Sequence, residues 1–421
     1  MNMERKKHKM KNVWKKVAAL TMAAAMTVPF AGCSNNASSS SAAGDSSAAG
    51  DSSAADGSTT AGGTLVIGGI GPITGAAAVY GNAVKNGAQL AVNEINANGG
   101  VNGMQLELNF QDDEHDPEKS VNAYNTLKDA GMKLLVGTVT SAPCVAVSAE
   151  AAKDNMFLLT PSGSSLDAIS AGDNCFRVCF TDPGQGKIAA DYIADNSLAA
   201  KVGIIYDSSD VYSTGILDGF KAEAAEKGLE ISAEEAFTAD AKTDFSVQIQ
   251  KVMDSGADLL FLPIYYQEAS LILQQVAAMD YSPKFFGCDG LDGILAVENF
   301  DLSLAKGVML LTPFAADAQD DLTQKFVTSY QEKYGEVPNQ FAADTYDAMY
   351  IIKAAAEKAN VTPDMSVSDI CDAMKVAMTE ITYDGLTGTG MTWSADGEPS
   401  KAPKAVVIDI AEDGTGSYKA M

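Results

Sequence analysis

The chain has 421 residues, 46% of them hydrophobic, which is enough apolar material for a globular body of two domains. It carries 55 acidic and 29 basic residues, and so acidic a body should repel nucleic acid and anionic membrane surfaces. His115 is the only histidine after residue 32, which excludes multi-histidine metal sites there. We expect no metal, no cofactor and no nucleic-acid partner.

Residues 1–32 have the pattern of an export signal. Seven basic residues are followed by a short apolar run, Val17 to Phe30, which is below the ~20 residues that a membrane-spanning helix needs. The sequence Phe30-Ala31-Gly32-Cys33 resembles a lipobox, which implies that Cys33 is lipidated and becomes the new N-terminus. The alternative is an uncleaved anchor followed by a chance cysteine.

Residues 33–63 form a segment of small and polar residues after Cys33. Such a composition cannot bury enough apolar surface to offset chain entropy, so we expect a disordered tether. Together with lipidation, it predicts a body held at the outer face of the cell membrane.

Residues 65–116 predict one complete β-loop-α-turn-β unit. A strand at 65–67 meets a Gly/Pro-rich loop at 68–75, and apolar residues then recur at helical spacing from Val79 to Ile95. Asn98-Gly99-Gly100 ends the helix, and 105–110 alternates like a strand. Units of this kind build parallel sheets.

Strands and helices alternate through the rest of the chain, which predicts an α/β architecture with two wound sheets. The expected strands are 134–137, 157–159, 176–180, 202–206, 229–233, 259–263, 284–286, 308–311, a strand around Met391, and 405–410. The expected helices are 117–130, 142–154, 186–196, 215–227, 245–255, 267–279, 319–334, 339–358 and 366–378.

Enzyme signatures are weak. The loop 69–74 half-matches a dinucleotide fingerprint, but Thr74 stands where the third glycine belongs and Pro72 removes a backbone donor. A phosphate loop is absent from the sequence, and any serine–histidine triad would need His115. The acidic residues 112–116 could hold Ca²⁺, but we favour a solvated acidic turn that begins a helix. Binding is therefore favoured over catalysis.

The segment Thr160–Leu166 places a hydroxyl-rich turn between a buried strand and a helical piece. Unpaired N–H groups at such a helix start attract an anion. N-capping by Ser164 or Ser165 explains the same residues without a ligand, and both roles are compatible. Residues 138–143 form a second strand-to-helix loop of this kind.

Three tyrosines, Tyr80, Tyr212 and Tyr265, stand in corresponding loops after successive predicted strands. Tyrosine has an apolar face and a polar tip, so at the mouth of a cleft it can cover a ligand and also bond it. Ordinary half-buried packing is the alternative.

Several segments together resemble the leucine/isoleucine/valine-type solute-binding proteins of ABC importers, which have the type I periplasmic-binding-protein fold. These are IGGIGPITG, LLTPSGSS, FRVCFTDPGQG, VGIIYDSSDVYSTG, FFGCDG and GTGMTW. The resemblance implies two doubly wound lobes joined by a hinge that the chain crosses three times, near residues 181, 312 and 394. Lobe 1 would comprise 64–181 plus 313–393, and lobe 2 would comprise 182–312 plus 394–421.

The same resemblance implies roles for individual residues. Ser141, Ser162 and Ser164 match positions that grip a ligand's α-carboxylate, and Asp289 matches an acidic residue that pairs with its α-amino group. The family's amino-acid binders usually have Glu there, and a solvated turn is the alternative for Asp289. Phe341 matches an apolar wall position, with core packing as the alternative.

The resemblance implies a monomeric, lipid-anchored receptor that captures a small amino acid, branched-chain by default, and delivers it to an ABC permease. Related ligands are amides, urea-like molecules and aromatic acids. A sensory ligand-binding module without a transporter is one alternative function, and an α/β enzyme acting on a nucleotide or sugar is another.

Overall fold

The computed structural model describes residues 62–421. The export signal, Cys33 and nearly all of the tether lie outside these residues. Within residues 62–421, no helix is both long enough and apolar enough to cross a bilayer.

The first sheet has five parallel strands, all of them from the first third of the described chain. Their order across the sheet is β2-β1-β3-β4-β5. The strands are β1 (Thr64–Gly71), β2 (Gln105–Asp112), β3 (Leu134–Gly137), β4 (Leu158–Thr160) and β5 (Cys175–Arg177).

The second sheet has seven strands in the order β12-β11-β10-β9-β8-β6-β7. Five of them run parallel, whereas β11 pairs antiparallel with both β10 and β12. The strands are β6 (Lys201–Asp207), β7 (Glu230–Phe237), β8 (Leu259–Leu262), β9 (Lys284–Gly287), β10 (Met309–Thr312), β11 (Lys404–Ile410) and β12 (Gly416–Ala420).

Helices connect nearly all of the parallel strands, and short 3₁₀ segments (η) interrupt the loops. The helices are α1 (Ala78–Ala97), α2 (Pro117–Asp129), α3 (Ser141–Asp154), α4 (Asp182–Asp195), α5 (Val211–Lys227), α6 (Ser246–Asp254), α7 (Tyr266–Ala277), α8 (Asp321–Tyr334), α9 (Gln340–Lys358) and α10 (Val367–Met378). The 3₁₀ segments are η1 (Leu166–Ala168), η2 (Asp289–Leu291), η3 (Ile294–Ala296) and η4 (Leu302–Ala305).

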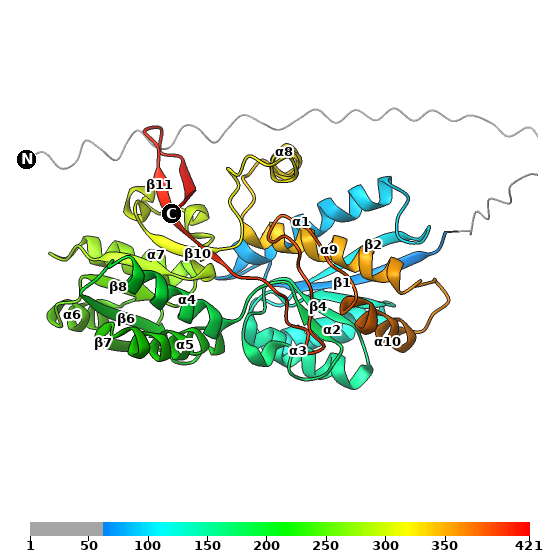
Figure 1. Cartoon of the computed structure of the whole chain (residues 1–421), viewed down its shortest axis with the longest axis horizontal. Helices are drawn as coiled ribbons and strands as arrows, with labels where there is room; N and C mark the ends of the chain where they lie inside the picture. The colour runs from blue at the N-terminus through cyan, green and yellow to red at the C-terminus, as the bar shows by residue number, and fades with distance from the viewer. Residues whose placement is uncertain (1–61) are drawn as a thin grey trace, which may run out of the picture. The chain divides into compact units, whose positions relative to one another are not determined.

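Each sheet is packed between helices on both faces (Figure 1). Helices α1 and α9 pack on each other over one face of the first sheet, and α2 and α3 cover its other face. In the second sheet, α4 and α5 form one layer, and α6 and α7 contribute to the other. Strands β3 and β8 are therefore buried at every residue, as expected for central parallel strands.

The chain passes between the two bodies three times. It leaves the first sheet after β5 and enters the second through α4. It returns after β10 to α9, which packs against α1, and it leaves again after α10 to form β11. This is the two-lobed, doubly wound fold expected from the sequence. We call the body around the first sheet the first lobe and the other the second lobe; the residues at which each gives way to the other remain a prediction.

Several local predictions differ from the structure, and three of the differences concern whole strands or their extent. Strand β1 continues through the expected glycine loop as far as Gly71, because the missing side chains admit neighbours: a Cβ on Gly71 would lie 2.4 Å from Val139 Cγ2. The strand expected around Met391 is a single bridge to Tyr383. Strand β12 was not predicted, and it forms a hairpin with β11 across the Gly414 turn.

Candidate functional site

A small cavity lies where the two lobes meet, at the carboxyl ends of the parallel strands. Open α/β sheets bind ligands at this end. The space between atoms there is about 230 Å³, including space open to solvent. All eight residues predicted as ligand contacts line it, together with Val139, Thr140 and Gly290: they are Tyr80, Ser141, Ser162, Ser164, Tyr212, Tyr265, Asp289 and Phe341.

The loops after β3 and β4 form one wall and are bonded to each other. Thr160 Oγ1 donates to Thr138 O at 2.7 Å, and Ser162 Oγ donates to Val139 O at 2.7 Å. Ser141 Oγ accepts a hydrogen bond from Ser165 N at 3.2 Å. These bonds join the two hydroxyl-rich loops into one rigid unit.

Hydrogen-bond donors remain free on this wall. Ser164 N–H makes no hydrogen bond to any residue of the described chain, and Ser141 is the first residue of α3, where helical N–H groups have no partner within the helix. Ser162 lines the cavity, but its hydroxyl proton is already donated to Val139 O. The donors available to an anion are therefore centred on Ser164 and Ser141.

Asp289 lies on the opposite wall, directly after β9, and is only 4% exposed. Tyr212 Oη donates to Asp289 Oδ1 at 2.8 Å, and Gln185 Oε1 accepts from Asp289 N at 3.0 Å. Burial raises the pKa of Asp289 to about 6, although the bond from Tyr212 opposes this rise. A cationic group in the cavity would favour its ionised form.

Aromatic rings fill much of the remaining wall. Tyr212 and Tyr265 are stacked with centroids 4.7 Å apart, and Tyr265 Oη is buried without a partner among the described residues. Burial raises the pKa of both phenols well above the usual value, so they are neutral. The unpaired hydroxyl of Tyr265 is thus available to a ligand.

Hydrogen bonds across the cavity hold the lobes together. Tyr80 Oη in α1 donates to Gly290 O and accepts from Tyr266 N at 3.2 Å. The Tyr80 ring packs on Phe341, with centroids 4.3 Å apart. Gln340 N, at the start of α9, donates to Asp292 Oδ2 at 2.9 Å. The structure is therefore that of the closed arrangement.

The placement of the aromatic residues differs from the sequence prediction in one respect. Tyr80 and Tyr212 lie in the first turns of α1 and α5 and not in loops. Helix α5 begins at Val211 and not at the predicted residue 215, so it includes Tyr212. Tyr265 immediately precedes α7. A helix fixes the direction of a side chain more firmly than a loop does, so the rings of Tyr80 and Tyr212 have well-defined positions in the cavity wall.

Sequence reasoning missed the buried polar residues behind the cavity. Asp182 and Gln185, in the first turn of α4, belong to the FRVCFTDPGQG segment but were given no role. Both oxygens of Asp182 are buried. Burial raises its pKa well above the usual value, although the neighbouring Ser164 side chain opposes this rise. A signal was present, since an Asp and a Gln opening a helix directly after a buried strand are placed at the ligand end of the sheet.

The acidic segment 112–116 serves local structure. Asp112 accepts hydrogen bonds from Ile73 N and the Thr74 hydroxyl, and Asp116 caps α2 by accepting from Lys119 N. Across residues 62–421, no group of three or more potential metal ligands gathers. The segment thus connects β2 to α2, and Asp116 is the N-cap of that helix.

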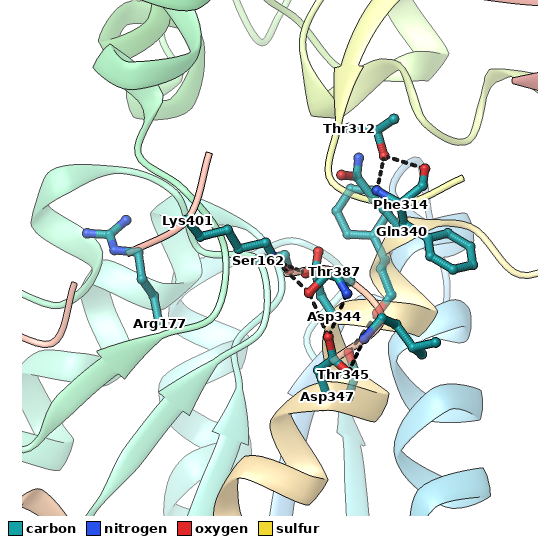
Figure 2. A network of polar contacts seen from close by, with 12 residues as sticks. Ser162, Arg177, Thr312, Phe314, Gln340, Asp344, Thr345, Asp347, Thr387 and Lys401 are labelled. Atoms are coloured by element: carbon teal, nitrogen blue, oxygen red, sulfur yellow. Dashed lines mark hydrogen bonds and ion pairs between the residues drawn. The ribbon is translucent and has the colours of Figure 1, made fainter. Parts of the chain in front are cut away.

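A buried polar network lies beside the cavity, on the segment that returns from α10 to β11 (Figure 2). Lys401 Nζ donates to Asp344 Oδ1 at 2.6 Å and to Thr387 Oγ1 at 2.7 Å. Asp347 Oδ2 accepts from the Thr387 hydroxyl at 2.7 Å. The Lys401 and Asp344 side chains are 1% and 3% exposed, so this ion pair fixes α9 to the third crossing from inside the protein.

Two lobes that close over a small cavity, with donors on one wall and a buried carboxylate on the other, define a solute-binding protein. Comparison with known proteins agrees. Residues 64–415 match the periplasmic binding protein family, and the chain belongs to this family. Its matched relatives are binding proteins and not enzymes.

Relatives and solved structures extend this result. The chain is 31% identical to the Leu/Ile/Val-binding protein BraC3 of Rhizobium johnstonii, over 73% of this chain and 84% of that protein. It is 30% identical to Leu/Ile/Val-binding protein homolog 3 of Brucella melitensis, over 68% and 76%. The branched-chain amino acid transporter substrate-binding protein LivJ of Streptococcus pneumoniae, solved in complex with isoleucine, superposes with a TM-score of 0.74 at 27% identity, over 85% of this chain and 100% of that one.

Proposed function

We propose that this protein is the lipid-anchored solute receptor of an ABC importer and that it binds a small α-amino acid between its lobes, a branched-chain one by default. The observation that carries the proposal is the polarity of the cavity. Free donors around Ser164 and Ser141 lie on one wall of the cavity, and the buried carboxylate of Asp289 lies on the other.

An α-amino acid fits this polarity at both ends. Its carboxylate accepts from the N–H and hydroxyl groups of the first lobe, where two helical starts favour negative charge. Its ammonium neutralises Asp289, which burial otherwise disfavours as an anion. Phe341, Val139 and the tyrosine rings leave an apolar space for the side chain. The relatives that bind leucine, isoleucine and valine support this class of ligand.

Aromatic acids are a weaker proposal for this chain. A fold relative from Rhodopseudomonas palustris was solved with 3,4-dihydroxybenzoic acid, but at 18% identity it supports the fold alone. A benzoate lacks the cation that the buried Asp289 needs. Asp289 therefore favours a zwitterion over an acid.

Delivery to a permease and attachment to the membrane complete the proposal. The sequence ending at Cys33 supports lipidation, and the small polar residues that follow support a tether between a membrane and the binding body. We propose that the protein acts as a monomer at the outer face of the membrane.

The test is a panel of ligands measured by thermal shift and calorimetry. L-leucine, L-isoleucine and L-valine should raise the melting temperature, whereas isopentylamine and 4-methylpentanoic acid each lack one end of the zwitterion. Losing a hydrogen-bonded charged group costs about 1.5–3 kcal/mol, so the affinity of either analogue should be about 10- to 100-fold lower. Equal binding of leucine and isopentylamine would overturn the proposed polarity.

A further inference from the structure

Arg177, at the end of β5, has a fully buried side chain with 0% exposure and does not line the cavity. Its NH1 donates to Gly163 O at 3.0 Å and to Ser165 O at 2.9 Å. These two carbonyls flank Ser164, the residue with the free N–H in the cavity wall. One cation therefore holds the backbone on both sides of Ser164.

Because the peptide bond is planar, the hydrogen bond from Arg177 to the Gly163 carbonyl also fixes the direction of the Ser164 N–H. The Gly163–Ser164 peptide is trans, because Gly137–Thr138 is the one cis bond in the described chain. In a trans peptide the C=O and the N–H point in opposite directions. Since Arg177 holds the Gly163 carbonyl, the Ser164 N–H points away from Arg177. Ser164 lines the cavity and Arg177 does not.

The returning segment of the third crossing holds Arg177 in place. Arg177 N donates to Gly397 O at 3.1 Å, and Trp393 Nε1 donates to Arg177 O at 2.8 Å. Arg177 NH2 lies 3.0 Å from Glu398 Oε1, and the Glu398 side chain is 35% exposed. Gly397 has a φ of +80°, and a Cβ there would lie 2.1 Å from Cys175 O. The segment is thus in close contact with β5 at this point.

We propose that Arg177 is a positioning residue for ligand recognition: it orients the Ser164 N–H and places a buried positive charge behind the wall that receives the ligand's carboxylate. This inference rests on the proposed function for the identity of the anion, but the ordering of the loop is independent of any ligand. Lysine cannot replace this function fully, because it lacks the rigid planar group with which arginine bonds both carbonyls through NH1 and contacts Glu398 through NH2.

The experiment compares Arg177→Met, Arg177→Lys and Glu398→Gln. The last is the matched control, because it removes the partly exposed ion pair and leaves both NH1 bonds intact. The first readout is amide hydrogen exchange of the ligand-free protein at Ser162, Gly163 and Ser165, whose N–H groups are bonded within the loops. Exchange there should be about 10-fold faster or more in Arg177→Met, with a smaller increase in Arg177→Lys and an unchanged rate in residues 141–154.

The second readout is affinity for L-leucine and isopentylamine. Arg177→Met should weaken leucine binding by about 10-fold or more and reduce the preference for leucine over the amine. Glu398→Gln should change leucine affinity by less than about threefold. If Arg177→Met does not fold, Arg177→Lys decides by the same readouts.

The positioning role is wrong if exchange in this loop is unchanged in the folded Arg177 variants, or rises equally throughout the first lobe. It is also wrong if exchange rises in the loop while leucine affinity and the preference over the amine stay as they are. If leucine fails to bind even the unaltered protein, the proposed amino-acid ligand fails, and hydrogen exchange alone decides whether Arg177 orders the loop.

Discussion

Gln340 Nε2 donates to the backbone carbonyl of Asp289 at 2.9 Å, so the first turn of α9 contacts the residue that supplies the carboxylate of the opposite wall. The same glutamine donates through its backbone N–H to Asp292. Because α9 packs on α1 in the first lobe and Asp289 follows β9 in the second, both bonds exist only while the lobes are closed. Closure and the placement of Asp289 are therefore one event.

Asp289→Asn should remove most of the stabilisation that the amino acid confers. Ligand at 100 times its Kd should raise the free energy of unfolding of the unaltered protein by about 2.7 kcal/mol. Asparagine keeps the size and loses a charge that burial disfavours, so the ligand-free protein should be no less stable than the unaltered one. Thermal shift with the best ligand of the panel measures both quantities.

The matched control for this variant is Asp301→Asn, which removes the same charge from an exposed cap of η4 and should keep the full ligand-induced shift. Binding to the unaltered protein should also weaken as the pH falls below about 6, where Asp289 becomes protonated, and Asp289→Asn should lack this dependence. A full shift at the same ligand concentration in Asp289→Asn would show that Asp289 is only a turn residue.

Ligand-free stability should increase as the pH falls from about 7 to about 5. Burial raises the pKa to about 6 at four carboxyls, so between their unfolded values near 3.8 and about 6 the folded state binds more protons. Stability then decreases with rising pH. His115 has the opposite effect on the pH dependence of stability, because burial lowers its pKa. It is a single group, whereas four carboxyls have raised pKa values. The four carboxyls are Asp113, Asp289, Asp292 and Asp347.

Urea unfolding at the two pH values measures this difference, and each unit of pKa shift corresponds to about 1.4 kcal/mol. Lower stability at about pH 5 than at about pH 7 would contradict the prediction. Asp347→Asn should reduce the slope, since it removes one of the four groups.

Tyr80→Phe should weaken ligand binding without a matching loss of ligand-free stability. The variant leaves Gly290 O and Tyr266 N without their partner across the cavity, and this cost of about 0.5–1.5 kcal/mol applies only to the closed arrangement. Affinity should fall between about twofold and about tenfold. Calorimetry measures the affinity, and small-angle scattering reports the fraction of closed molecules.

Tyr281→Phe is the matched control for Tyr80→Phe. Tyr281 Oη donates to Ala257 O at 2.9 Å within the second lobe, so its loss should lower the melting temperature and leave the affinity unchanged. Equal effects of the two variants on affinity would mean that the Tyr80 hydroxyl does not link the lobes.

Lys401→Met should destabilise the protein by about 3–5 kcal/mol, because it leaves Asp344 as a buried carboxylate without its cation. The double variant Lys401→Met/Asp344→Leu should recover part of this loss, since no unpaired charge remains. Lys353→Met breaks the more exposed pair with Glu357 and should cost about 0–1 kcal/mol. Urea unfolding measures all three, and equal costs for the two lysine variants would be inconsistent with a buried, stabilising pair.

If Cys33 is the lipidated residue, as we propose, Cys33→Ala should abolish lipid attachment, because the variant lacks the sulfur atom to which the lipid would be joined. The variant body should be released into the medium or remain attached only by an uncleaved signal. Metabolic labelling with a fatty acid and cell fractionation distinguish these results, and Cys179→Ala is the control cysteine. Normal processing and acylation of Cys33→Ala would show that another residue is modified.

The sequence predicted the elements best where the spacing of apolar residues and the residues that end an element indicate the same bounds. Strand β3 has the predicted bounds, because it is a fully apolar run between a glycine-ended helix and a hydroxyl-rich loop. Strand β1 was predicted too short, because a glycine-rich sequence is compatible with either a loop or a strand. The packing of its neighbours decides between them, and the sequence alone does not show that packing. The hairpin of β11 and β12 depends on pairing between strands, which a single short segment such as Gly416–Ala420 does not reveal.

The cavity residues were predictable, but their hydrogen-bond partners were not. The resemblance and the placement of the tyrosines after strands selected eight of the lining residues. The order of strands explains why they meet at one end of the sheets. That Ser162 donates its proton to Val139 O, or that Arg177 lies behind Ser164, depends on which loop atoms meet in three dimensions. An arginine in a short apolar strand gives no sign of the carbonyls it will contact.

The division of the cavity between two bodies also sets how a solute leaves. Tyr80, Phe341 and the serine loops stand on one side, and Tyr212, Tyr265 and Asp289 stand on the other, so neither body alone retains a captured molecule. A tightly bound solute does not leave through a permanent channel. It is released when the two lobes separate. Any partner that pulls the halves apart therefore controls the lifetime of the complex, whatever the intrinsic strength of each contact.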